Sequence, residues 1–196
     1  MSGRLVYLMG PSGSGKDSLI EAARGALKAL GVTTVRRVIT RSAEAVGEEA
    51  DGVSSQIFAE RQARGDFAMH WQANGLRYGI PASIDATLAA GGHVLVNGSR
   101  AYLPQALSRY PDLLPIVLRV DDAALRRRLV ARGRESSADI DQRLARNAGF
   151  ASDDASVQMA GVIIEVLDNS DALERTLEAL LQLLANYGIS ATAGRI

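Results

Sequence analysis

The chain has 196 residues, enough for one domain that buries about 70% of the surface of its unfolded chain. Acidic and basic residues balance at 22 each, which excludes nucleic acid as an expected partner, because a general polyanion binder should be basic. There is no cysteine, no apolar run of the ~18 residues that span a bilayer and no signal-peptide pattern, so we expect a cytoplasmic protein without disulfides, thiol chemistry or a membrane partner.

The first predicted element is an apolar strand that runs into a glycine-rich loop. Residues 4–9 are apolar and β-prone, and residues 17–30 show the spacing of an amphipathic helix. Between them stand Gly10, Pro11, Ser12, Gly13, Ser14, Gly15 and Lys16. Glycines let backbone N–H groups turn inward as a phosphate nest, and the lysine bridges the β- and γ-phosphates. The pattern predicts a nucleoside triphosphate site over residues 10–18; the alternative is a glycine-rich turn without a ligand.

Asp17 stands where such loops normally carry Ser or Thr. The usual hydroxyl ligates Mg²⁺, and a carboxylate is also a hard oxygen ligand for that ion. We therefore expect Asp17 to hold the metal, with Ser18 as the alternative hydroxyl. Asn97 or Asp121 is expected near the same ion.

The rest of the chain alternates strands with helices. Strands are predicted over residues 33–39, 93–97, 114–120 and 161–167, helices over 57–64, 84–90, 102–109, 123–132, 137–147 and 171–185, a loop over 40–52, and a hairpin of 67–71 with 76–80 around Asn74-Gly75. The alternation predicts an α/β protein with a parallel sheet and helices on both faces, a phosphate-loop NTPase fold. We expect a single kinase domain, with its core over 1–39 and 82–187, an inserted substrate-binding subdomain over about 40–81 and a mobile lid over about 131–140.

Further motifs resemble those of guanylate kinases and extend over nearly the whole chain. They are GPSGSGK, Thr40-Arg41, Gly65-Asp66-Phe67, Tyr78-Gly79 and Arg132-Gly133-Arg134-Glu135. This chain departs from the guanylate-kinase pattern at five places. The family's second arginine is Glu44 here, its aromatic step is Glu49-Ala50 and its guanine-binding glutamate is Met69. Its hydroxyl residue is Ile80 here, and its acidic residue is Asn97. A site without those hydrogen-bond partners cannot select guanine. The acceptor expected from this comparison has phosphates but no purine.

The strings GPSGSGKDSL, RRVITRSAE, YGIP, VLVNGSR, ARGRES and RLARN resemble the ribose 1,5-bisphosphate phosphokinases of phosphonate degradation, which are guanylate-kinase relatives. The resemblance implies a kinase that uses ATP and Mg²⁺ to convert ribose 1,5-bisphosphate into 5-phosphoribosyl diphosphate. Its partner is then a small phosphorylated sugar. Arg41 and Tyr78 match contacts to the acceptor phosphate, and Arg37 and Asn97 complete the expected substrate site. The sequence does not give the oligomeric state and leaves a homodimer open.

The expected catalytic set is Lys16, Arg132, Arg134 and Arg143. Guanidinium groups stay charged and contact phosphate in a bidentate way, which suits a lid that closes over the transferring group. The neighbouring Arg127 is interpreted as part of a solvated helix face.

Other polar residues receive structural interpretations. His70 and His93 are expected to be packed or surface residues. Asp168-Asn169 is either a ligand contact at the end of a strand or an Asx turn.

Two other functions remain open at this point. One is a guanylate kinase-like nucleoside monophosphate kinase with relaxed base recognition, and the other is a non-catalytic guanylate-kinase-like binding module. Such modules tend to lose the phosphate loop and the lid arginines, and this chain has both. Small-molecule sugar kinases of other phosphate-loop families are a third option, against which YGIP argues.

Overall fold

The computed structural model describes residues 3–41, 50–133, 136–151 and 162–190, without the side chains of Arg132 and of residues 146–151. The strands are β1 (Leu5–Met9), β2 (Val32–Val35), β3 (Arg37–Thr40), β4 (Ala50–Val53), β5 (Phe67–Ala73), β6 (Leu76–Pro81), β7 (His93–Asn97), β8 (Leu114–Arg119) and β9 (Glu165–Asp168). The helices are α1 (Lys16–Ala29), α2 (Ser55–Ala63), α3 (Ser83–Ala89), α4 (Leu103–Arg109), α5 (Asp122–Arg132), α6 (Ser137–Ala151) and α7 (Leu173–Asn186), with a 3₁₀ turn η1 (Arg100–Tyr102).

The central sheet of the described residues has the strand order β2-β7-β1-β8-β9, and every pair in it is parallel. Leu8 on β1 lies opposite Asn97 on β7, and Val35 on β2 lies opposite Val96. The carboxyl ends of β1, β2 and β7 therefore meet at one edge of the sheet, where open α/β sheets bind ligands.

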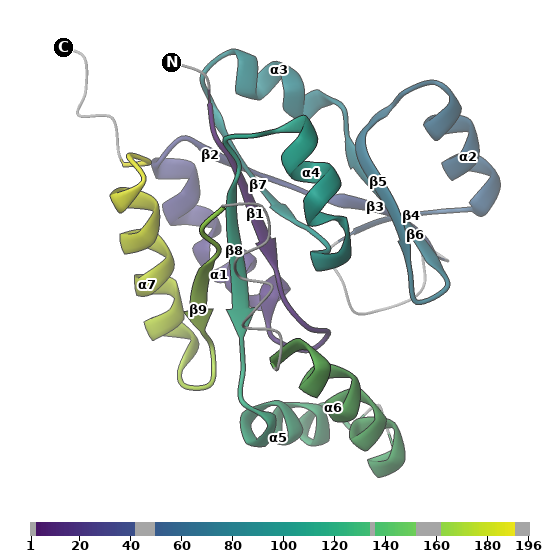
Figure 1. Ribbon diagram of the computed structural model, residues 1–196, viewed down its shortest axis with the longest axis vertical. Coiled ribbons are helices and arrows are strands. Elements are labelled where there is room, and N and C mark those ends of the chain that lie inside the picture. The colour runs from purple at the N-terminus through teal and green to yellow at the C-terminus, as the bar shows by residue number, and fades with distance from the viewer. Residues whose placement is uncertain (1–2, 42–49, 134–135, 152–161, 191–196) are drawn as a thin grey trace.

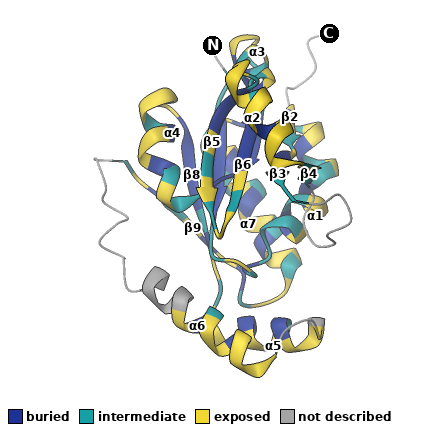
Figure 2. Ribbon diagram, turned by 90° about the vertical axis from the view of Figure 1, so that its right-hand side faces the viewer, coloured by how far each residue is buried: buried dark blue, intermediate teal, exposed yellow. Residues whose placement is uncertain are grey.

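Helices cover both faces of this sheet (Figure 1). Strand β1 is buried throughout and contributes alternate residues to two cores, as the two-residue period of a strand requires. Tyr7 and its odd-numbered neighbours pack with α3 and α4, whereas Val6 and Leu8 pack with α1 and α7. Figure 2 shows buried strands inside and exposed helix surfaces outside. These observations confirm the predicted α/β class with a parallel sheet between two helical layers.

A second sheet, with the order β4-β3-β6-β5 in the described residues, stands beside the first. The prediction of one strand over 33–39 is wrong, because β2 pairs with β7 in the first sheet and β3 pairs with β6 in the second. Arg36 lies between the two strands, so a change of sheet separates two runs of β-prone residues that look continuous. The prediction of a loop over 40–52 also misses β4, because residues 50–53 contain Asp51 and Gly52, which are rare in strands.

The hairpin of the second sheet is as predicted. Strands β5 and β6 pair antiparallel across Asn74 and Gly75, both of which have positive φ, 51° and 74°. The ring of Phe67 lies so close to Gly79 that a Cβ there would be 2.6 Å from it, so the Tyr78-Gly79 step needs glycine for packing.

Helices α5 and α6 form a pair with its own small core, Leu125, Leu129, Ile140 and Leu144. The pair lies apart from the layers of the sheet, at the lower end in Figure 1. Helix α5 begins at Asp121, whose carboxylate accepts from the Ala124 N–H, and ends at Gly133 with φ 62°.

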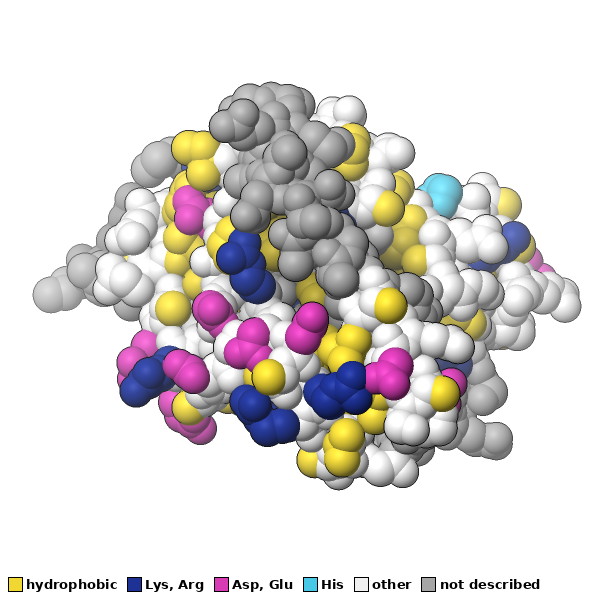
Figure 3. Space-filling view, turned by 60° about the horizontal axis from the view of Figure 1, so that its bottom comes forward, with side chains coloured by type: hydrophobic (Ala, Val, Ile, Leu, Met, Phe, Trp, Pro, Cys, Tyr) yellow, Lys and Arg dark blue, Asp and Glu magenta, His cyan; other side chains and the backbone are white. Residues whose placement is uncertain are grey.

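The end of the molecule that carries α5 and α6 displays basic and acidic side chains interspersed (Figure 3). This mixture agrees with the balanced net charge of the chain. No helix in the described part of the chain is long and apolar enough to cross a membrane.

Candidate active site

The phosphate loop connects β1 to α1 and depends on three glycines. Gly13 and Gly15 have φ of 90° and 93°, a left-handed backbone that favours glycine. A Cβ on Gly10 would lie 2.6 Å from the Leu118 carbonyl oxygen, and one on Gly15 would lie 2.6 Å from Asn169 Nδ2. The loop thus needs glycine both for its turns and for close packing against the ends of β8 and β9. Its curled backbone and the first turn of α1 together form an anion site.

Asn169, which follows β9, holds the phosphate loop in place. Its side chain is only 2% exposed, and its Nδ2 donates to the Ser14 carbonyl at 2.7 Å. Its Oδ1 accepts from the buried hydroxyl of Thr176 at 3.0 Å, and its own N–H donates to the Arg119 carbonyl. The amide therefore links β8, β9 and α7 to the phosphate loop.

The preceding residue, Asp168, forms the Asx turn that the sequence left open. Its Oδ1 accepts from the Ser170 N–H at 2.7 Å. Hydrogen bonds from Ser170 also lower the pKa of Asp168. Of this pair, Asn169 therefore reaches the phosphate loop and Asp168 shapes the turn after β9.

Lys16 lies over the loop that precedes it. Its ammonium donates to the carbonyl oxygens of Gly10 at 2.8 Å and Pro11 at 3.0 Å. The lysine charge is thereby held against the rim of the nest, where it adds to the positive potential of the inward N–H groups and the helix N-terminus.

Asp17 and Asn97 meet at the edge where β1 and β7 end. Asn97 is 4% exposed, and its Nδ2 donates to Asp17 Oδ1 at 2.9 Å. Its other side-chain atom, Oδ1, is buried without a hydrogen-bond partner. An oxygen of this kind next to a carboxylate fits a hard cation such as Mg²⁺. Among the described residues, no cluster of three or more His, Cys, Asp or Glu gathers.

Tyr7 supports the segment that follows Asn97. The tyrosine hydroxyl donates to the Ser99 carbonyl and accepts from the Ser99 N–H, both at 2.9 Å, and burial raises its pKa. A Cβ on Gly98 would lie 2.1 Å from the Tyr7 ring, so Gly98 allows the chain to cross directly over it. The position of Asn97 is thus fixed by β7 on one side and by this contact on the other.

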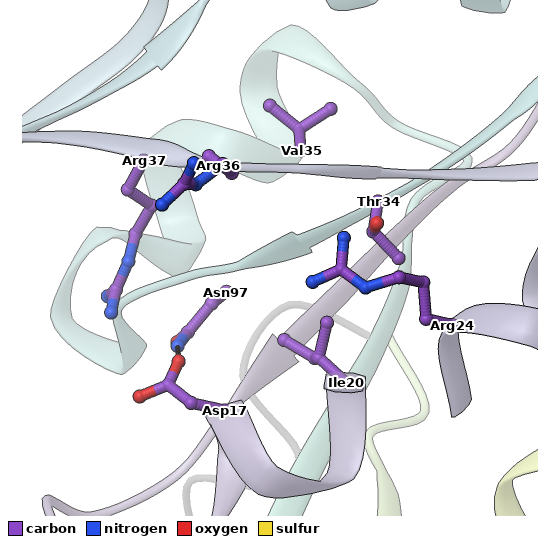
Figure 4. A pocket seen from close by; sticks show the side chains of 8 residues that line it. All are labelled: Asp17, Ile20, Arg24, Thr34, Val35, Arg36, Arg37 and Asn97. Carbon is purple, nitrogen blue, oxygen red and sulfur yellow. Dashed lines mark hydrogen bonds between the residues drawn. The ribbon is translucent and has the colours of Figure 1, made fainter. Parts of the chain in front are cut away.

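A shallow pocket that is open to solvent lies beside Asp17 and Asn97. Its other lining residues are Ile20, Arg24, Thr34, Val35, Arg36 and Arg37. Figure 4 shows the Asp17–Asn97 pair at one end, with Ile20 and Arg24 along α1 and the arginines of the β2–β3 junction across from them. Three guanidinium groups and one carboxylate make this lining predominantly cationic.

Arg37 connects the pocket to an aromatic group of the second sheet. Its side chain is buried and its guanidinium lies 5.4 Å from the ring centre of Tyr78. Tyr78 stacks on Trp71 at 5.6 Å, and Trp71 also contacts Tyr102. The predicted substrate residues Arg37, Tyr78 and Asn97 therefore lie in one connected region with Asp17.

Helices α5 and α6 contact the phosphate loop. Arg143 on α6 donates from Nη1 to Ser12 Oγ at 2.7 Å. A Cβ on Gly13 would lie 3.0 Å from Leu125 of α5, so the core of the helix pair rests directly on the loop. Of the expected lid arginines, Arg143 is thus at the loop, Arg134 lies outside the described residues, and Arg132 ends α5 with its side chain undescribed.

Several other predicted residues have local roles. Asp121, considered for the metal, caps α5 instead. Ser18 is exposed in the first turn of α1, and Arg41 follows β3, with its N–H bonded to the Ile39 carbonyl. His93 accepts from the Arg4 N–H, and burial lowers its pKa, whereas His70 is exposed. Glu44 and Glu49 lie outside the described residues.

Sequence reasoning missed Arg24 and the loop contacts of Asn169. Arg24 carries a recognisable signal, because it follows Asp17 by seven residues and Ile20 by four, a spacing that places all three on one helical face. Asn169 is a common residue at the end of a strand, and only the tertiary structure shows that it reaches Ser14.

Comparison with known proteins gives full-length similarities. The chain is 61% identical over 193 residues to the ribose 1,5-bisphosphate phosphokinase PhnN of Pseudomonas fluorescens (strain SBW25), a match that covers 98% of this chain and 100% of the relative. It is 57% identical to the protein of the same name from Pseudomonas paraeruginosa over 94% of this chain and 96% of the relative. It is 54% identical to the protein of the same name from Azotobacter vinelandii, over 94% of this chain and 97% of the relative. No protein-family model matches the chain.

Solved structures show the same fold. The guanylate kinase of Anaplasma phagocytophilum is similar with a TM-score of 0.67 at 19% identity, over 95% of this chain and 86% of that one. The gluconokinase of Sinorhizobium meliloti 1021 is similar with a TM-score of 0.52 at 19% identity, over 95% of this chain and 96% of that one. The phosphate-loop kinase fold predicted from the sequence is confirmed.

Proposed function

The chain belongs to the ribose 1,5-bisphosphate phosphokinase family, and from that premise we propose that it transfers the γ-phosphoryl group of ATP to ribose 1,5-bisphosphate. The products are ADP and 5-phosphoribosyl diphosphate. The observation that carries the proposal is 61% identity over 98% of the chain, a span that takes in the phosphate loop and the pocket. This function assigns the chain to phosphonate catabolism.

In the reaction, an oxygen of the acceptor 1-phosphate forms a bond to the γ-phosphorus of ATP, and the bond from that phosphorus to the β-bridging oxygen breaks. The electron pair leaves with ADP. Phosphoryl transfer of this kind requires positioning and charge stabilisation more than covalent participation by the enzyme. The attacking oxygen belongs to a phosphate that is already ionised at neutral pH, so no strong general base is needed.

The loop supplies the nucleotide half of the site. Residues 10–18 bind the triphosphate, with the N–H groups of the nest around the β-phosphate and Lys16 between the β- and γ-phosphates. Arg143 lies at the loop through Ser12 and contributes positive charge near the transferring group. Arg132 and Arg134 complete this cationic lid.

Asp17 is the protein ligand for Mg²⁺ in this proposal, with Asn97 Oδ1 beside it. The bound ion would neutralise charge on the β- and γ-phosphates. Asp17→Asn should raise the Mg²⁺ concentration for half-maximal activity about tenfold, because a charged ligand is lost. Asp17→Ser should recover part of that loss through the usual hydroxyl ligand, and Asp112→Asn, which changes an exposed carboxylate, is the control. An unchanged Mg²⁺ dependence in Asp17→Asn would remove Asp17 from the metal site.

The acceptor is held by the second half of the site. Arg41 and Tyr78 contact the reacting phosphate, and Arg37 and Asn97 lie beside it. The connected packing of Arg37 on Tyr78, and of Asp17 on Asn97, supports this arrangement because it puts acceptor groups next to the phosphate loop.

The decisive experiment is an ADP-release assay with ribose 1,5-bisphosphate, GMP and AMP as acceptors, with the diphosphate product identified by ³¹P NMR. We expect kcat/KM for ribose 1,5-bisphosphate to exceed that for either nucleotide by at least about 10²-fold, because a missing set of base contacts costs several kcal/mol. A preference for GMP would overturn the proposal in favour of a nucleoside monophosphate kinase. ATP binding without turnover of any acceptor would favour a binding module.

A further inference from the structure

We propose that the arginine pocket beside α1 binds the second phosphate of the acceptor, the 5-phosphate that does not react. Arg24 and Arg36 hold it, and Arg37 lies between this end of the pocket and the reacting phosphate. This inference rests on the proposed function. It means that binding of the 5-phosphate, in place of base recognition, gives the enzyme its specificity for the acceptor.

The pocket extends along α1, as the binding of a sugar with two phosphates requires. Asp17, Ile20 and Arg24 line it from one face of α1. Seven residues of helix rise by about 10 Å, so the pocket extends by roughly that length from the phosphate loop to Arg24. A ribose with phosphates on carbons 1 and 5 carries them at opposite ends of the sugar. With the reacting phosphate near Asp17, the other phosphate faces the Arg24 end.

The pocket also has the charge that a phosphate dianion requires. Arg24 comes from α1, whereas Arg36 and Arg37 come from the junction where the chain leaves the first sheet for the second. Figure 4 shows these side chains around the same space. Guanidinium groups bind phosphate oxygens with paired N–H donors, which makes arginine the usual residue for this purpose. An uncharged purine at this end would gain little from such groups.

The ion pairs of the outer two arginines do not prevent phosphate binding. Arg24 donates to Glu21 and Arg36 lies 3.7 Å from Asp51, and all four side chains are at least 43% exposed. Exposed pairs of this kind contribute about 0–1 kcal/mol, so a dianionic phosphate can compete for either guanidinium. Glu21, which accepts from Arg24 Nε and Nη2, lies one turn before it on α1.

Arg37 is the fixed member of the group. It is 8% exposed and packs on Tyr78, whose ring is held in turn by Trp71. A buried guanidinium with its orientation set by an aromatic ring binds an anion without first losing much side-chain entropy. Arg37 thereby joins the outer pocket to the region of the reacting phosphate.

The test compares two acceptors in the Arg24→Gln and Arg36→Gln variants and in the double variant. Ribose 1,5-bisphosphate has the phosphate in question, and ribose 1-phosphate lacks it. For the bisphosphate, we expect kcat/KM to fall about tenfold in each single variant and about 10²-fold in the double variant, mainly through KM, because each substitution removes a charge-assisted hydrogen bond. For ribose 1-phosphate, kcat/KM should change less than about twofold, since the acceptor has no group at this end of the pocket. Arg175→Gln is the matched control, since Arg175 is also a helical arginine paired with a nearby carboxylate.

A second measurement covers the case in which ribose 1-phosphate reacts too slowly to assay. Calorimetry with ribose 5-phosphate should show binding to the wild type and a Kd about 10²-fold higher in the double variant. Equal losses with both acceptors, or an unchanged Kd for ribose 5-phosphate, would overturn the inference. Failure of the proposed function is a different result: the wild type would then not turn over ribose 1,5-bisphosphate at all, while ribose 5-phosphate binding would still report on the pocket.

Discussion

The two halves of the proposed site are built from different parts of the chain. The nucleotide half is mainly backbone: three glycines and the first turn of α1 form it, and the amide of Asn169 holds it in place. The acceptor half consists mainly of side chains from α1, the β2–β3 junction, β6 and β7. The two halves meet at the hydrogen bond between Asp17 and Asn97.

This difference explains where specificity can change. A backbone nest binds any triphosphate in the same way, so its sequence is constrained over consecutive residues. A lining of side chains can be replaced one residue at a time without loss of the fold. The acceptor half is therefore the part of the molecule in which a base-binding site and a phosphate-binding site can occupy similar positions on one scaffold.

The largest expected effect comes from Lys16, the charged side chain of the phosphate loop. Lys16→Ala should lower kcat by about 10²–10³-fold, because a positioned charge at the transferring phosphate is lost. Lys28→Ala is a close control, since Lys28 is the other lysine of the chain and is exposed in the last turn of α1. Steady-state assays of both variants measure the contrast. Normal turnover in Lys16→Ala would mean that the loop is not the catalytic nucleotide site.

Arg143 is expected to give a smaller effect on the same half. Arg143→Gln should lower kcat by about 10- to 10²-fold, the equivalent of roughly 1.5–3 kcal/mol for a charge-assisted contact, with little change in the Kd of ATP. Arg127→Gln, on the exposed face of α5, should leave both unchanged. If Arg143→Gln weakened ATP binding and spared kcat, Arg143 would be a binding residue and not a transition-state residue.

Removing the support of the loop tests whether the nucleotide half is rigid in itself. Asn169→Ala deletes the side-chain donor to the buried Ser14 carbonyl, whereas the Thr176 hydroxyl keeps its bond to the Asp168 carbonyl. The free energy of unfolding should fall by about 1–3 kcal/mol, and the KM for ATP should rise with it. Urea titration and kinetics measure the two effects, with Asn186→Ala on the exposed end of α7 as control. A stability loss with unchanged ATP kinetics would show that the loop keeps its shape without the amide.

The two halves are also unequally predictable from sequence. The loop is contiguous, so its strand, its glycines, Lys16 and the following helix can be placed from local patterns alone. The division of residues 33–39 between two sheets cannot be predicted in this way, because the β-propensity of Val35 and Val38 is the same whichever sheet each joins. The pocket needs this division, since it is what turns Arg36 and Arg37 toward α1. The contact of Arg143 with Ser12 spans 131 residues and follows from the packing of α5 and α6 on the loop, not from a local pattern.

The smallest expected effect concerns the second sheet and separates its stability from its chemistry. Asn74 has φ 51°, a conformation that asparagine tolerates better than most residues because its side chain bonds locally. Asn74→Ala should lower the free energy of unfolding by about 1 kcal/mol, and Asn74→Gly should be neutral or slightly stabilising, because glycine adopts this conformation without strain. The turn lies at the tip of the hairpin, and Tyr78 lies further along β6, so the KM for the acceptor should be unchanged in both variants. A raised acceptor KM in Asn74→Ala alone would mean that strain at the turn reaches the Tyr78–Arg37 contact, and the acceptor half would then depend on its backbone as closely as the nucleotide half does.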